Sequence, residues 1–208
     1  MLNSQKFNQA LFKCKTNSKA PATKHGYHDS EFNADYEKWI EQGYNIGIDC
    51  KKSGIVVFDQ DVDEERGLNG IETIRQLEQE LGKLPQTLTQ TTPRGGKHLF
   101  FSSEGINNPI GKIGKDVDIK YNGYVLCEPS TINGKKYKFT HGVIGEQFII
   151  SKLPQKWLDY INRPKKQQYT FNSDPPKTKN RAISGNFDKI YENCLFIKNC
   201  VDNAKTLS

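Results

Sequence analysis

The sequence has no long hydrophobic run. No apolar stretch approaches the ~20 residues that a membrane-spanning helix requires. Residues 1–15 also lack the apolar block of a secretory signal peptide. We therefore expect a cytoplasmic protein that has no membrane partner.

Cysteine is scarce as well. The chain has five cysteines at irregular spacing, and an odd number of this kind is typical of reduced cytosolic thiols rather than of a disulfide framework. Cys194 and Cys200 form the closest pair, but their spacing does not suit a zinc knuckle and no histidine lies near them. The cysteines therefore indicate neither a disulfide-stabilised secreted domain nor a structural zinc site.

Charge and length point to one class of partner. The chain has 30 Lys and Arg residues against 24 Asp and Glu residues, a net charge of +6, which favours a polyanionic partner such as nucleic acid. Binding to nucleic acid would weaken steeply as salt increases. With 208 residues, the chain is long enough for the core of one domain and an appended segment.

Three polar motifs, each beside an apolar strand-like run, carry the chemical information. In chain order they are Asp59-Gln60-Asp61, Arg94-Gly95-Gly96-Lys97-His98 and Asp116-Val117-Asp118-Ile119-Lys120. In a β-strand, residues i and i+2 project from the same face, so Asp59 and Asp61 are expected to point together. Asp118 would add a third carboxylate from another strand.

Three convergent carboxylates predict a site for two metal ions. Mg²⁺ prefers hard oxygen ligands, and two ions about 3.5–4 Å apart form the clamp used for in-line displacement at phosphorus. The two glycines of the second motif allow close backbone approach to phosphate. Arg94, Lys97 and His98 would neutralise the charge of a triphosphate. The order of the motifs therefore favours a nucleotidyl transferase with Mg²⁺ or Mn²⁺.

Each motif alone also has a structural explanation. The first acidic pair can be a solvated turn, His98 can be a satisfied histidine of a strand, and Asp118 can be a solubilising charge on an edge strand. The ordered combination beside strand-like runs is what favours the functional interpretation.

The ordered set and its flanks resemble a known family. The sequence between Lys19 and Tyr137 is similar to the bifunctional primase/polymerase (prim-pol) domain of the archaeo-eukaryotic primase superfamily, found in replication proteins of phages, plasmids and other mobile elements. Besides the three motifs, the segments that carry the likeness are Lys19-Ala20-Pro21, Lys24-His25-Gly26-Tyr27, Asn45-Ile46-Gly47-Ile48, Ser53-Gly54, Gly123-Tyr124-Val125, Glu128-Pro129-Ser130, Gly134 and Tyr137.

The resemblance implies a DNA primase/polymerase that transfers nucleotides from dNTPs or NTPs on a single-stranded DNA template. The metal ligands would be Asp59, Asp61 and Asp118, which together with His98 form the catalytic set. His98 would also contact the triphosphate, with Arg94, Lys97 and Lys120 as further nucleotide-binding residues. A helicase domain would follow the chain, which we interpret as a fragment of a longer replication protein.

The chain departs from the family pattern in three places. Arg94 replaces a serine, and Glu128 replaces a proline. No cysteine or histidine lies between Asp61 and His98, so the zinc-binding insertion of some relatives is absent. The role of Glu128 stays open at this point.

Two other functions remain as alternatives. A rolling-circle nickase has a similar sheet but needs paired histidines and a nucleophilic tyrosine, and His98 has no His-x-His partner. The other alternative is a catalytically inactive module that binds single-stranded DNA or nucleotide for a replicative helicase.

The apolar patterns predict an α+β fold. Strands are expected at residues 45–49, 55–59, 87–91, 98–102, 117–121 and 124–127, and helices at 37–42, 71–81 and 154–161. Asn133-Gly134 predicts a hairpin turn. The family resemblance implies that the catalytic sheet is RRM-like and mostly antiparallel, beside a small N-terminal α/β unit.

The domain organisation is expected to change after the last of these helices. Residues 1–163 would form the catalytic domain, 164–180 a basic linker, and 181–208 a helical segment that begins a truncated helical domain. The basic linker is a candidate for holding the template backbone or simply a solvated tether.

Overall fold

The computed structural model describes residues 8–144 and 147–163, which form an α+β fold dominated by antiparallel sheet. Its largest sheet has six strands in the order β13-β6-β7-β3-β9-β8, and every neighbouring pair is antiparallel. These strands are β3 (Ile55–Gln60), β6 (Thr89–Thr91), β7 (Lys97–Ser102), β8 (Lys112–Ile113), β9 (Val117–Lys120) and β13 (Lys138–His141).

A second, three-stranded antiparallel sheet has the order β1-β2-β10. It consists of β1 (Leu11–Cys14), β2 (Asn45–Asp49) and β10 (Tyr124–Cys127). The 3-10 turn η1 (Gly26–Asp29) and the short helix α1 (Tyr36–Glu41) lie beside it. This part is the small N-terminal unit, completed by β10 from much later in the chain.

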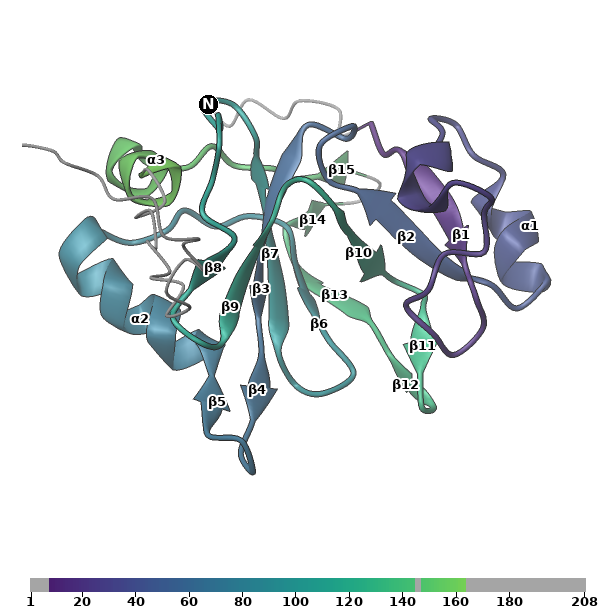
Figure 1. The fold of residues 1–208 in the computed structure, drawn as a ribbon, viewed down its shortest axis with the longest axis horizontal. Coiled ribbons are helices and arrows are strands. Elements are labelled where there is room, and N and C mark those ends of the chain that lie inside the picture. The colour runs from purple at the N-terminus through teal and green to yellow at the C-terminus, as the bar shows by residue number, and fades with distance from the viewer. Residues whose placement is uncertain (1–7, 145–146, 164–208) are drawn as a thin grey trace, which may run out of the picture. The chain divides into compact units, whose positions relative to one another are not determined.

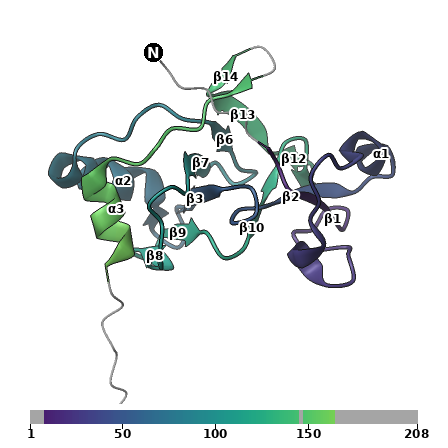
Figure 2. The ribbon, with the colours of Figure 1, turned by 90° about the horizontal axis from the view of Figure 1, so that it is seen from above.

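Two helices cover one face of the six-stranded sheet. They are α2 (Gly70–Leu81) and α3 (Gln155–Asn162), and both views show them on the side away from β1 and β2 (Figures 1 and 2). Val56, Phe58, Phe101 and Ile119 pack against them in one hydrophobic cluster. The opposite face of β3 contributes Ile55 and Val57 to a second cluster with the three-stranded sheet. β3 is therefore buried on both faces.

Local sequence explains where α1 and α2 begin and where α2 ends. The side chain of Asp35 accepts a hydrogen bond from Lys38 N at 3.5 Å, and that of Asn69 accepts one from Glu72 N at 3.1 Å. Gly82 ends α2 with a φ of 88°. The expected helices are thus present within about a residue of their predicted bounds.

Three small hairpins extend from the sheets. They are β4 (Val62–Asp63) with β5 (Leu68–Asn69), β11 (Thr131–Ile132) with β12 (Lys135–Lys136), and β14 (Val143–Ile144) with β15 (Gln147–Phe148). Asn133 and Gly134 both have positive φ between β11 and β12, as the predicted hairpin turn requires.

The predicted α+β fold with a mostly antiparallel sheet is confirmed. The predicted strand at 87–91 begins later, at Thr89, while β1, β8, β13 and the β4–β5 and β14–β15 hairpins were not predicted. The predicted linker at 164–180 and the helical segment at 181–208 lie outside the described residues.

The buried cysteines in the described part of the chain are free thiols. Cys14, Cys50 and Cys127 take part in no disulfide. Burial raises the pKa of Cys14 to about 12, which leaves the thiol protonated and unreactive at neutral pH. Cys194 and Cys200 lie outside the described residues. No helix among the residues placed by the structure is long and apolar enough to cross a membrane.

Candidate active site

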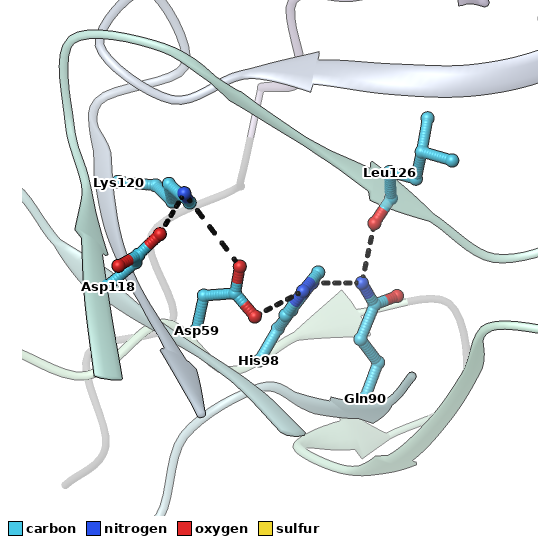
Figure 3. Close-up of polar contacts among 6 residues, drawn as sticks. All are labelled: Asp59, Gln90, His98, Asp118, Lys120 and Leu126. Carbon is cyan, nitrogen blue, oxygen red and sulfur yellow. Dashed lines mark hydrogen bonds and ion pairs between the residues drawn. The ribbon is translucent and has the colours of Figure 1, made fainter. Parts of the chain in front are cut away.

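The site is built by strand register around Asp59. β3 lies between β7 and β9, and Asp59 is directly opposite His98 on one side and Asp118 on the other. Residues directly opposite each other in an antiparallel pair project from the same face. Figure 3 shows the three side chains side by side, with Lys120 above the two carboxylates. The structure therefore brings together four of the residues that the sequence predicted.

Hydrogen bonds and ion pairs join these side chains. His98 Nε2 lies 3.1 Å from Asp59 Oδ1. Lys120 Nζ lies 2.6 Å from Asp118 Oδ2 and 4.0 Å from Asp59 Oδ2, and Lys112 Nζ lies 3.4 Å from the other oxygen of Asp118. Each carboxylate is thus neutralised by groups of this same chain.

Three pKa shifts follow from this arrangement. Burial acts to raise the pKa of Asp59, but the hydrogen bond from His98 and the nearby positive charges outweigh it and lower the pKa. For Lys120, burial acts to lower the pKa, and the contact with Asp118 outweighs it and raises the pKa. The pKa of Asp61 is raised by partial burial and by the charges of Asp59 and Asp118. Asp61 is therefore influenced by the charges of the other two carboxylates.

The metal site remains a prediction. In the ranges that the structure describes, no three side chains of His, Cys, Asp or Glu converge closely enough to hold a metal ion. The ammonium of Lys120 instead contacts Asp59 and Asp118 together, where it supplies compensating positive charge. The donor chemistry of the three aspartates still fits Mg²⁺ or Mn²⁺, because these ions prefer carboxylate oxygens.

A pocket of about 380 Å³ opens above this face of the sheet. Asp59, His98 and Lys120 line its side on the six-stranded sheet, and Tyr124, Val125 and Leu126 of β10 line its side on the three-stranded sheet. The remaining lining residues are Lys19, Tyr27, Asn122, Gly123 and Tyr137. The volume is in the range of small-molecule sites, and its polar groups converge from both sheets.

Asp116 anchors the segments around the site. Its carboxylate accepts hydrogen bonds from Asn69 N at 3.1 Å and Thr73 Oγ1 at 3.0 Å, at the start of α2. Its carbonyl accepts one from Asp61 N at 2.8 Å, and Asp61 O accepts one from Gly70 N at 2.8 Å. The chain after β3 is thereby tied to α2 and to the beginning of β9.

Three residues from the sequence motifs lie elsewhere. Lys97 pairs with Gln60, so strand alternation places it on the opposite face from His98. Arg94 is exposed and precedes β7. Its charge acts on Tyr137: burial raises the pKa of that tyrosine, and the positive charge of Arg94 partly offsets the rise. Glu128 Oε2 accepts a hydrogen bond from Phe139 N at 2.6 Å, and Glu128 does not line the pocket.

Several residues of the pocket have no role in the predictions made from the sequence. Lys19, Tyr27, Tyr124 and Tyr137 occur in the segments that carry the family likeness, which was the available signal. Gln90, which contacts His98 behind the pocket, had no such signal.

The two glycines of the second motif have different roles. Gly95 has a φ of 88° and turns the chain, with open space around it. A Cβ at Gly96 would overlap the carbonyl oxygen of Gln60, so this glycine allows β7 to approach the end of β3. Gly96 thus approaches the protein backbone, whereas the approach to phosphate stays a prediction.

Gly96→Ala is therefore expected to displace the end of β3 beside Asp59 and Asp61. We expect a loss of about 1–3 kcal/mol in the free energy of unfolding. Urea unfolding measures this effect. Gly111→Ala is the control, because its Cβ would meet no atom within 4 Å. Equal behaviour of the two variants would contradict the proposed strand contact.

Comparison with known families identifies the class of protein. The model of the N-terminal domain of bifunctional DNA primase/polymerases matches residues 4–157. The chain belongs to this family, as its motifs indicated. Membership implies a primase/polymerase of the nucleotidyltransferase type with DNA and nucleotides as substrates. No curated protein was found to match the chain.

Proposed function

We propose that this protein starts and extends nucleic-acid chains on a single-stranded DNA template by transferring nucleotides from dNTPs or NTPs. The observation that carries the proposal is the alignment of Asp59, His98 and Asp118 across three strands beside a pocket of about 380 Å³. Two cations, Lys19 and Lys120, line the same pocket and complement a polyphosphate.

Asp59, Asp61 and Asp118 are the residues that would hold two Mg²⁺ or Mn²⁺ ions. When bound, such ions activate the attacking 3′-hydroxyl and neutralise the charge of the triphosphate and leaving pyrophosphate. Asp59 is near the end of β3, and Asp118 lies opposite it on β9. Because β3 is paired with a strand on each side, the carboxylates would hold the cations at a fixed position. The reaction joins the 3′ oxygen to the α-phosphorus and releases pyrophosphate.

His98 and Lys120 would bind the triphosphate. In the structure, His98 Nε2 contacts Asp59 and Lys120 Nζ contacts Asp118. When cations neutralise the carboxylates, these two donors would instead form hydrogen bonds with phosphate oxygens. Arg94, whose side chain is exposed before β7, stays a candidate. The side chain of Lys97 is on the opposite face of the sheet from His98. It could contact the triphosphate only if the nucleotide extended past the beginning of β7.

The far wall of the pocket would hold the nucleoside part of the substrate. The rings of Tyr27 and Tyr124 lie 5.6 Å apart, and Tyr124 Oη donates a hydrogen bond to the carbonyl of Lys19 at 3.0 Å. Aromatic faces at this position suit stacking with a base or sugar.

Synthesis on an unprimed template tests the proposal. The protein is incubated with unprimed single-stranded DNA, labelled dNTPs or NTPs, and Mg²⁺ or Mn²⁺, and the products are resolved on a sequencing gel. We expect short products, and their labelling shows the preferred sugar. Extension of a supplied primer without unprimed synthesis would place initiation in a part of the replication protein outside this chain. No product in either format, together with tight DNA binding, would contradict the proposal.

One observation favours the alternative of a catalytically inactive module that binds single-stranded DNA or nucleotide. Lys120 already neutralises Asp118 and lies near Asp59, and a site that never binds a cation would keep this arrangement. Mn²⁺ binding measured by electron paramagnetic resonance separates the two functions, because the inactive module is expected to bind no Mn²⁺ at Asp59.

The wider context is also part of the proposal. We place the protein in the replication of a phage, plasmid or other mobile element, with a helicase C-terminal to this chain. Residues 164–180 would act as a basic linker and 181–208 as the start of a helical domain. A longer chain that gains unprimed synthesis over this one would support that organisation.

A further inference from the structure

Gln90 is a fully buried amide immediately behind the candidate site. It lies on β6, directly opposite His98 of β7, and none of its surface is exposed. Neither the sequence motifs nor the family match gives it a role. A buried amide must satisfy its hydrogen-bonding groups, so its partners define what it does.

All of the polar groups of this side chain have partners. Gln90 Nε2 lies 2.7 Å from His98 Nδ1 and 2.7 Å from the carbonyl oxygen of Leu126. Gln90 Oε1 accepts a hydrogen bond from Glu128 N at 3.3 Å. Figure 3 shows the amide nitrogen between His98 and Leu126.

Two backbone groups fix the orientation of the amide. The carbonyl of Leu126 can only accept a hydrogen bond, so the NH₂ group must face it. The backbone N–H of Glu128 can only donate, so the amide oxygen must face that group. A rotated amide would place acceptor against acceptor and donor against donor. The NH₂ group therefore faces His98.

The orientation of the amide determines the tautomer of His98. Because the amide N–H donates to Nδ1, that ring nitrogen carries no proton, and the proton of the imidazole is on Nε2. Nε2–H then donates to Asp59 Oδ1 at 3.1 Å. The ring is also enclosed by aromatic neighbours, with Phe100 and Tyr137 at centroid distances of 6.1 and 5.7 Å.

We propose that Gln90 is a positioning residue that holds His98 with its proton on Nε2, so that the histidine presents a hydrogen-bond donor to an anionic acceptor in the pocket. This inference rests on the proposed function, in which the acceptor is a phosphate oxygen of the incoming nucleotide. The same tautomer excludes Nε2 from binding a metal ion, because the nitrogen that bears the proton has no free lone pair.

Asp59 alone cannot fix the tautomer during the reaction. It contacts only Nε2, and in the proposed function its carboxylate also binds cations. Gln90 holds the other nitrogen and has no predicted role as a metal ligand. It also links β6 to β10 through Leu126, so the ring is held from the junction of the two sheets.

Nuclear magnetic resonance of ¹⁵N-histidine-labelled protein tests the tautomer directly. Long-range ¹H–¹⁵N spectra show which ring nitrogen carries a proton, and His98→Asn identifies the signals of His98 among the four histidines. We expect a proton on Nε2 and none on Nδ1 in the wild type. In Gln90→Met, which lacks the amide N–H that donates to Nδ1, part of the population is expected to carry the proton on Nδ1. A proton on Nδ1 in the wild type would overturn the proposal.

A double-mutant cycle then tests whether Gln90 acts through His98. We expect Gln90→Met to weaken the binding of dATP with Mg²⁺ roughly 10-fold, as expected for a lost hydrogen bond to a charged group. In a His98→Asn background, Gln90→Met should have no further effect. An equal loss in both backgrounds would show that Gln90 only supports the fold and would overturn the positioning role.

These results are separable from the proposed function. The tautomer of the wild type is measured without any catalysis, so a proton on Nδ1 would overturn the role of Gln90 even if a variant fails to fold. Absence of nucleotide incorporation by the wild type would count against the proposed function alone.

Discussion

Replacing Asp59 and Asp61 together with asparagine is expected to reduce primer extension at least about 1,000-fold while the protein remains folded. Asparagine keeps the shape of aspartate and can still accept the hydrogen bond from His98 Nε2, but it lacks the negative charge that the proposed function requires for binding a cation. Metal ions contribute several kcal/mol of transition-state stabilisation, and each 1.36 kcal/mol corresponds to a factor of ten in rate. Primer extension at saturating dNTP measures the loss.

The matched control is Glu64→Gln with Glu65→Gln, two residues whose side chains are exposed. These residues follow the site directly and their replacement removes the same amount of charge, but neither carboxylate belongs to the predicted metal ligands. We expect this control to extend primers within about threefold of the wild type, since exposed substitutions away from such a site have small effects. Retention of more than a tenth of the activity by the Asp59 and Asp61 variant, with an unchanged melting temperature, would refute their assignment as metal ligands.

The local features of this fold could be predicted from the sequence because their causes are local. The apolar run before Asp59 identifies a buried strand, and the capping residue Asn69 and the terminal Gly82 delimit α2. Some strands lacked such a signal. β13, for example, has the sequence Lys-Phe-Thr-His, lies at the edge of its sheet and is mostly exposed.

The arrangement of the site required knowledge of strand register. Register depends on pairing between segments far apart in the chain, and a shift of one residue moves every side chain to the other face. Lys97 and Lys120 illustrate the point. Both belong to predicted motifs, and alternation within one strand already separates Lys97 from His98. Only the pairing of β7 and β9 with β3 shows that Lys120 shares a face with Asp59 and that Lys97 does not.

Asp116 and Asp118 show the same limit for acidic residues. They have the i, i+2 spacing that predicts a shared face in a strand, but Asp116 precedes β9 and its carboxylate binds the beginning of α2. Gln90 was beyond sequence reasoning for a different reason. Its role depends on a tautomer set by two backbone groups, and nothing in a Thr-Gln-Thr segment indicates that environment.

The largest loss of stability is expected for Trp157→Ala on α3. The side chain is completely buried, its ring centroid lies 5.9 Å from that of Phe58, and its Nε1 donates a hydrogen bond to the carbonyl of Gly82 at 2.8 Å. Removing a buried aromatic side chain costs roughly 3–5 kcal/mol, because burial and packing are lost and a cavity remains. We expect a decrease of this size in the free energy of unfolding, measured by circular dichroism in urea.

Two further variants separate the causes of that loss. Trp157→Phe keeps an aromatic ring but removes the donor to Gly82. Its loss in the free energy of unfolding is expected to be about half that of Trp157→Ala. Lys156→Ala changes an exposed neighbour on the same helix and is expected to stay within about 0.5 kcal/mol of the wild type. Because Phe58 immediately precedes Asp59, a stable core under α3 is what holds the central strand of the site in place. A loss below 1 kcal/mol for Trp157→Ala, where roughly 3–5 is expected, would mean that α3 is not part of the catalytic domain.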